Sequence, residues 1–159
     1  MTRTVAPARR LLIIDDHAPF RHTLACLLQV AGHTVFEAGE GSAGLALLRQ
    51  ELLDLVITDQ DMPGLTGWDV ARLVKATHPR IPVVLVTGGM DVDATIRSRR
   101  EQVDAILRKP FPLPELLVLI ARLTAGAASG VGSSGARNLV RAGQDKAQPR
   151  ARGGTWHAS

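Results

Sequence analysis

Aromatic residues and cysteine are scarce in this sequence of 159 residues. Phe, Trp and Tyr together make up 3% of it, Tyr is missing altogether, and Cys26 is the single cysteine. One cysteine excludes an intrachain disulfide and any metal site built from several thiolates. Cys26 lies in an apolar stretch, so we expect a buried, structural thiol. Because hydrophobic residues still make up 45% of the chain, we expect a compact domain with an aliphatic core.

Long apolar runs are also missing. No run approaches the roughly 20 residues that a transmembrane helix needs. Residues 1–10 include arginines but no apolar segment ending in a small-residue cleavage site, so they do not indicate a secretion signal. We therefore expect a cytoplasmic protein that does not contact a membrane.

The net charge of +4 is unevenly distributed along the chain. Residues 11–123 contain 11 Lys or Arg and 14 Asp or Glu, so the excess of basic residues lies at the two ends. We expect a flexible basic arm over residues 1–9, a folded domain over residues 10–123, and a disordered Gly/Ser/Arg-rich tail over residues 124–159. The acidic folded part argues against a nucleic-acid-binding face, although weak binding through the basic tail stays open.

Strand and helix patterns alternate between residues 10 and 123. Short apolar runs that end at polar residues indicate parallel strands buried on both faces, and these are residues 11–14, 34–37, 55–58, 82–86 and 105–107. Apolar residues at helical spacing fall within residues 19–31, 42–48, 68–74, 91–102 and 115–123, with Ser42 as a candidate cap of the second helix. The alternation predicts an α/β fold, a doubly wound five-stranded parallel sheet with five helices.

Chemically useful side chains follow four of the five expected strands. They are the pair Asp15 and Asp16, then Asp59, Thr87 and Lys109. In open parallel sheets, ligands bind at the carboxyl ends of the strands, near the point where the strand order reverses. Three carboxylates at one edge need a cation, and Mg²⁺ is the usual hard divalent ion where phosphate is also present. Asp59 could then act as a nucleophile toward a phosphoryl group whose charge Lys109 offsets.

These side chains belong to four motifs that occur in a specific order. The motifs are Asp15-Asp16, Leu55-Val-Ile-Thr-Asp59-Gln-Asp-Met-Pro63, Val84-Leu-Val-Thr87-Gly-Gly89 and Arg108-Lys109-Pro110-Phe111. Over residues 10–123 the set resembles the receiver domains of two-component signalling. The resemblance implies a flavodoxin-like, receiver-type sheet, with Asp59 as the phosphoacceptor.

The same resemblance implies the other members of the site and the partners. Mg²⁺ would be bound by Asp15, Asp16, Asp59 and the backbone carbonyl of Asp61. Thr87 and Lys109 would contact the phosphoryl group, and the Lys109–Pro110 bond would be cis. The phosphoryl donor would be a sensor histidine kinase or a phosphotransfer protein, and a downstream protein target would bind residues 91–122. Without an effector domain after the receiver, we expect a stand-alone regulator rather than an enzyme.

Two positions depart from the receiver pattern. Receivers commonly carry Tyr or Phe three residues before the lysine, as part of the activation switch, whereas this chain has Ile106. Gly88 and Gly89 follow Thr87, where the first position is commonly Ala, and two glycines loosen the loop. We therefore expect a phosphoryl group that is incompletely covered and short-lived.

Several alternatives stay open at this point. Asp15 and Asp16 alone could cap the following helix. The segment from Asp59 to Asp61 is also similar to the first motif of haloacid-dehalogenase-type phosphatases, although only Glu115 and Asp145 follow Lys109 as a source of the further acidic pair that those enzymes need. A pseudo-receiver that acts unphosphorylated is a third possibility, favoured by Ile106 alone. We expect His17 and His22 to be surface residues.

Overall fold

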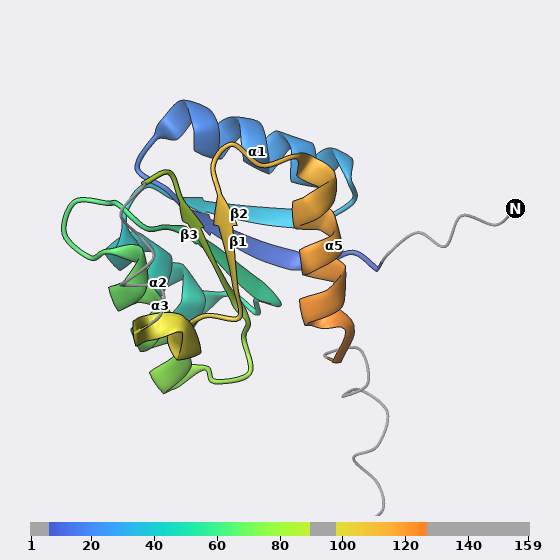
Figure 1. Ribbon diagram of the computed structural model, residues 1–159. Coiled ribbons are helices and arrows are strands. Elements are labelled where there is room, and N and C mark those ends of the chain that lie inside the picture. Colours follow the sequence, from blue (N-terminus) through green and yellow to red (C-terminus); the bar gives the residue numbers. More distant parts are fainter. Residues whose placement is uncertain (1–6, 90–97, 127–159) are drawn as a thin grey trace, which may run out of the picture.

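The computed structural model describes residues 7–89 and 98–126 and has three layers, a sheet between two layers of helices (Figure 1). The elements in chain order are β1 (Arg10–Ile14), α1 (Ala18–Val30), β2 (Thr34–Ala38), α2 (Gly41–Gln50), β3 (Leu55–Asp59), α3 (Gly67–Thr77), β4 (Val83–Thr87), the short 3-10 helix η1 (Arg100–Gln102), β5 (Ala105–Arg108) and α5 (Leu113–Thr124). None of the helices among these residues is long and apolar enough to cross a membrane.

The five strands form one parallel sheet in the order β2-β1-β3-β4-β5. The chain therefore runs outward from β1 to β2, then crosses to β3 and continues to the other edge. The strand order reverses between β1 and β3, and their carboxyl ends are the expected place for a ligand. The predicted sheet is confirmed, with strand ends that differ by at most one residue.

The core is divided by the sheet into two clusters. Side chains of a strand alternate between its faces, so Leu11 and Ile13 of β1 point to one cluster and Leu12 and Ile14 to the other. The first cluster packs under α1 and α5, and the second under α2 and α3. Burial on both faces explains why β1, β3 and β4 are nearly continuous apolar runs, whereas the edge strands β2 and β5 are only partly buried. Figure 1 shows the same division, with α1 and α5 on one side and α2 and α3 on the other.

Two local expectations are wrong. Cys26 is exposed, because the buried face of α1 is formed by Leu24, Ala25 and Leu28 and Cys26 points away from it. Ser42 does not cap α2, which begins one residue earlier, after Glu40; the Ser42 hydroxyl instead donates a hydrogen bond to the Glu40 carboxylate at 2.5 Å. The sequence pattern indicated both helices correctly. It did not predict which face of α1 is buried or at which residue α2 begins.

The fourth expected helix falls on residues 91–102, of which residues 91–97 lie outside the described part of the chain. Residues 127–159 of the expected tail and residues 1–6 of the expected arm also lie outside it. Arg9, within the expected arm, is tied to the start of β2: its carbonyl accepts a hydrogen bond from the Thr34 amide at 2.8 Å.

Candidate functional site

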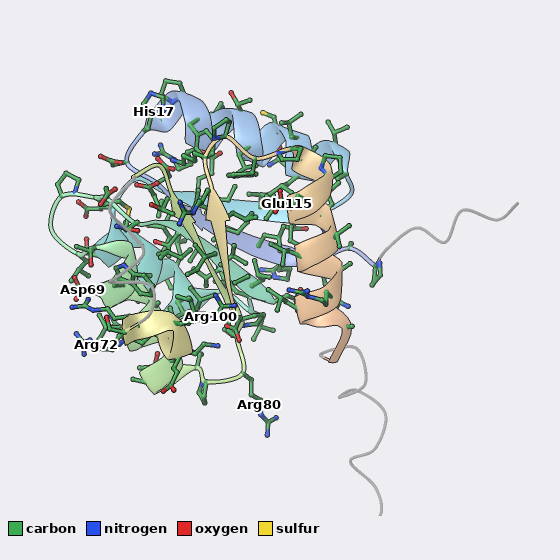
Figure 2. All side chains as sticks on the ribbon, in the orientation of Figure 1. His17, Asp69, Arg72, Arg80, Arg100 and Glu115 are labelled. Carbon is green, nitrogen blue, oxygen red and sulfur yellow. The ribbon has the colours of Figure 1, made fainter. Side chains whose placement is uncertain are left out.

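The carboxyl ends of β1, β3, β4 and β5 bring the predicted site residues together. Asp15 follows β1, Asp59 ends β3, Thr87 ends β4 and Lys109 follows β5. Figure 2 places His17, just after Asp15, and Arg80, before β4, toward opposite ends of the molecule, which marks the carboxyl and amino ends of the strands. The site therefore lies at the edge of the sheet that the sequence predicts.

Lys109 joins two carboxylates across the sheet. Its Nζ donates hydrogen bonds to Asp15 Oδ2 and to Asp59 Oδ1, each at 2.9 Å. The other oxygen of each carboxylate accepts a backbone amide from its own loop, His17 N–H at 2.8 Å for Asp15 and Asp61 N–H at 3.1 Å for Asp59. Each carboxylate is thus oriented by one ammonium bond and one amide bond.

Burial makes these bonds strong. Asp15 is 2% exposed, Asp59 8% and Thr87 1%, whereas the Lys109 side chain is 25% exposed. A buried charge is tolerated only when it is paired and hydrogen-bonded. The Lys109 ammonium pairs with both carboxylates, so Asp15, Asp59 and Lys109 together retain one uncompensated negative charge.

The pKa shifts follow from this charge balance. Burial raises the pKa of Asp59, and the negative charge of Asp15 adds to the rise, while the hydrogen bond from Lys109 opposes it. Burial lowers the pKa of Lys109, but its hydrogen bonds to Asp15 and Asp59 outweigh burial and raise the pKa overall. Lys109 is therefore a stable cation at neutral pH, available to a group that carries negative charge.

Asp16 and Asp61 are placed differently from the buried pair. Both residues are exposed, in the loops that follow β1 and β3. Within residues 7–89 and 98–126, no group of three or more His, Cys, Asp or Glu is arranged as a metal site, so the magnesium site at Asp15, Asp16 and Asp59 stays a prediction. What the structure brings together is the pair Asp15 and Asp59, with Lys109 between them.

The loop after β4 supplies the hydroxyl and an open space. Thr87 Oγ1 accepts a hydrogen bond from the Gly89 amide at 3.3 Å, and the Thr87 carbonyl accepts one from the Lys109 amide at 2.7 Å. Among the residues that the structure describes, none lies within 4 Å of a Cβ added at Gly88. The Lys109–Pro110 bond is cis, as the resemblance implied.

Ile106 lies in β5, away from the carboxylates. It is half-buried and packs against the cluster under α2 and α3. It also lines a pocket of about 570 Å³ between η1, β5 and α5, together with Arg100, Pro114, Val118 and Leu119 among others. Ile106 therefore contacts both the core and a pocket on the surface.

Three residues near the site had no place in the sequence prediction. Arg21, in α1, donates a hydrogen bond to the Asp15 carbonyl at 2.5 Å and pairs with Glu37 at 3.3 Å. Phe20 lies with its ring centroid 4.0 Å from Lys109 Nζ. The scarcity of aromatic residues was a usable signal for Phe20, since the chain has three Phe and two of them lie at Lys109.

Gly67, the first residue of α3, is the third. A Cβ added there would collide with the carbonyl oxygen of Asp59, and would come within 2.6 Å of Leu85 Cδ1 and 2.9 Å of Gln60 Cα. Because Gly67 has no side chain, the first turn of α3 can pack against the backbone at the end of β3. The expected helix over residues 68–74 left Gly67 outside it, because close approach of backbone is not visible in a sequence pattern.

Comparisons with known proteins agree with this geometry. The family model described as the response regulator receiver domain matches residues 11–121. The protein PilH of Pseudomonas aeruginosa is 37% identical over 119 residues, which cover 74% of this chain and 98% of PilH. Of several other curated relatives, this chain spans only about a quarter to a half of the length.

Solved structures match as well. A response regulator receiver domain protein from Clostridium thermocellum superposes with a TM-score of 0.71 at 30% sequence identity, covering 76% of this chain and 98% of that one. The response regulator TrrA from Thermotoga maritima, in a complex with Mg²⁺ and BeF, gives a TM-score of 0.66 at 28% identity, covering 72% of this chain and 98% of TrrA.

Proposed function

Because this chain belongs to the response regulator receiver domain family, we propose that Asp59 accepts a phosphoryl group and that the phosphorylated protein signals by binding another protein. One observation carries the proposal: Lys109 Nζ lies 2.9 Å from both Asp59 and Asp15 at the carboxyl edge of the sheet. This gives Asp59 a neighbouring cation that can move from the carboxylate to an incoming phosphoryl oxygen.

The proposed reaction transfers a phosphoryl group from a donor to the carboxylate of Asp59. A carboxylate oxygen of Asp59 attacks the phosphorus of a phosphohistidine or a small acyl phosphate, a phosphorus–oxygen bond forms, and the bond to the departing nitrogen or oxygen breaks. Lys109 offsets the negative charge on the phosphoryl oxygens, and the Thr87 hydroxyl, released from Gly89, donates to one of them. The product is an acyl phosphate on Asp59.

Mg²⁺ is the cofactor that this donor set favours. Asp15 and Asp59 share one ammonium and so retain a negative charge, and Asp16 is exposed beside them. Carboxylate and carbonyl oxygens are the ligands that Mg²⁺ prefers, so Asp15, Asp16, Asp59 and the backbone carbonyl of Asp61 would hold it. Bound there, the ion would neutralise charge on the transferred group. The complex of TrrA with Mg²⁺ and BeF supports this choice.

The donor is proposed to be a sensor histidine kinase or a phosphotransfer protein, and the output to be protein binding through residues 91–122. The pocket around Ile106 supports that surface, because Val118 at its border is 68% exposed although apolar. The cytoplasmic location stays a prediction, and weak nucleic-acid binding through the basic tail stays an open alternative. Comparing DNA affinity with and without residues 127–159, over a range of salt concentrations, tests the last of these.

Two other functions are less well supported. A phosphatase of the haloacid-dehalogenase type would use Asp61 as its acid and needs a second acidic pair. Of the acids after Lys109, Glu115 is exposed on α5, where Figure 2 shows it far from His17, and Asp145 lies outside the described residues. A pseudo-receiver that acts unphosphorylated would not need the two hydrogen bonds from Lys109 to Asp15 and Asp59.

Incubation with acetyl phosphate and Mg²⁺, followed by intact-mass measurement, tests the proposal. We expect a phosphate-sized gain in the wild type, none in Asp59→Asn, and a retained gain in Asp61→Asn, the matched control two residues away. A chelator should abolish the gain. Repeated turnover of a phosphomonoester that Asp61→Asn abolishes would support the phosphatase instead, and no gain with any donor would support the pseudo-receiver.

A further inference from the structure

Phe20, in the first turn of α1, contacts the ammonium group of Lys109. The ring centroid lies 4.0 Å from Nζ, well inside the roughly 6 Å within which a cation is attracted to an aromatic face. The ring itself is held by Phe111, whose centroid lies 6.2 Å away at an interplanar angle of 85°, the edge-to-face arrangement that aromatic pairs prefer. Phe111 follows Lys109 by two residues, so the lysine loop and α1 fix each other.

The ring completes the surroundings of the ammonium. Two of its three N–H donors bond Asp15 and Asp59, and the aromatic face lies against the same nitrogen. An aromatic face is negatively polarised, so it attracts the cation without taking it from either carboxylate. A branched aliphatic side chain could fill the same space but would offer no such attraction.

We infer that Phe20 is a positioning residue, which holds the Lys109 ammonium between Asp15 and Asp59 at the place where it meets the phosphoryl group. This inference rests on the proposed phosphorylation of Asp59 and adds a residue outside the four motifs to the site. Phe20 acts through Lys109 and does not touch the phosphoryl donor.

A purely structural role for Phe20 makes a different prediction. The residue also borders a small groove of about 110 Å³ with Thr23, Leu24, Leu27, Phe111 and Leu113. If apolar packing were its whole contribution, Phe20→Leu would preserve the function as well as Leu27→Ala does. If the aromatic face matters, Phe20→Tyr should preserve the function and Phe20→Leu should not. Leu27, 43% exposed on the same helix, is therefore the matched control.

The first experiment measures the geometry alone, without metal or phosphate. Protons above an aromatic face shift upfield in NMR spectra, so the ε-methylene protons of Lys109 should be shifted upfield in the wild type. The shift should be kept in Phe20→Tyr and Leu27→Ala and lost in Phe20→Leu. Identical Lys109 signals in the wild type and Phe20→Leu would overturn the inference.

The second experiment measures the rate of phosphorylation by acetyl phosphate, a small donor that needs no docking surface on α1. Losing a partly exposed cation–π contact should slow Phe20→Leu about threefold to tenfold, with Phe20→Tyr and Leu27→Ala within about twofold of the wild type. Equal rates for the wild type and Phe20→Leu would overturn the role of Phe20. A wild type that takes up no phosphate at all would instead contradict the proposed function, and the NMR result would still report whether Phe20 holds Lys109.

Discussion

At the scale of single residues, the site is defined by an imbalance of charge. Two buried carboxylates share one ammonium, at 2.9 Å from each, and burial is the largest cause of the raised pKa of Asp59. The folded protein thus holds a proton on Asp59 more tightly than the unfolded chain does. The contribution of Asp59 to stability is therefore fully present below the ordinary carboxyl pKa of 3.8 and is lost as the pH rises through the raised pKa.

Asp59→Asn should therefore stabilise the protein at neutral pH in the absence of divalent ions. The amide keeps an oxygen that can accept the hydrogen bond from Lys109 but cannot ionise beside Asp15. The difference from the wild type should shrink as the pH falls below the raised pKa and should vanish at strongly acidic pH. Urea unfolding in a chelator, across neutral to acidic pH, measures it. The exposed Asp61→Asn is the control, and a variant Asp59→Asn that is less stable than the wild type at neutral pH would refute this account.

At the scale of elements, α3, the helix that follows β3, helps to explain how the site is shaped. The beginning of α3 is fixed by a capping box: Thr66 Oγ1 accepts the Asp69 amide at 3.3 Å, and Asp69 Oδ2 accepts the Thr66 amide at 3.1 Å. Figure 2 shows Asp69 and Arg72 together on this part of the surface. The bonds from Thr66 are the largest cause of the lowered pKa of Asp69, with Arg72 and Arg99 adding to it.

Thr66→Ala should cost about 1 kcal/mol in the free energy of unfolding, the usual value for a lost N-cap. The contribution of Asp69 is present above its ordinary pKa and is lost as the pH falls through the lowered pKa, so the cost should decrease in strong acid. Thr77→Ala, an exposed threonine in the last turn of the same helix, should change stability by less than about 0.5 kcal/mol. Equal losses for both variants in chemical unfolding would argue against the capping box.

The close contact at Gly67 gives a second prediction for α3. Gly67→Ala places a methyl group against the Asp59 carbonyl and Leu85, so the helix must move or the strand end must shift. We expect a loss of about 1–3 kcal/mol in stability, as for other overpacked sites. Gly88→Ala, whose added methyl group meets no described residue within 4 Å, should be nearly neutral. Thermal unfolding of the two variants makes the comparison, and a tolerated Gly67→Ala would show that the two backbones are not in contact.

The loop after β4 bears on the lifetime of the phosphorylated state. Gly88 and Gly89 are exposed and carry no side chain that could cover the site next to Thr87. We expect water to reach the acyl phosphate and hydrolyse it within minutes rather than hours. The mass of the phosphorylated protein, followed over time after removal of the donor, gives the half-life. A half-life of many hours would contradict the prediction.

At the scale of the whole molecule, the sequence was sufficient for the topology and for the chemical residues. Short apolar strands that end at Asp15, Asp59, Thr87 and Lys109 could be recognised, because burial on both faces and the common strand edge leave a regular pattern. Contacts between segments that lie far apart in the sequence leave no such pattern. The ring of Phe20 over Lys109 depends on how α1 packs, and the exposure of Cys26 depends on the rotation of that helix.

The central claim is that Asp59 itself carries the phosphoryl group. Borohydride reduces an acyl phosphate to an alcohol, so treating the phosphorylated protein with it should convert Asp59 into homoserine, which tandem mass spectrometry of the peptide containing β3 can locate. We predict homoserine at position 59 after treatment with acetyl phosphate and Mg²⁺, and unmodified aspartate without the donor. Homoserine at another aspartate, or a phosphorylated protein in which residue 59 remains aspartate after reduction, would contradict the claim.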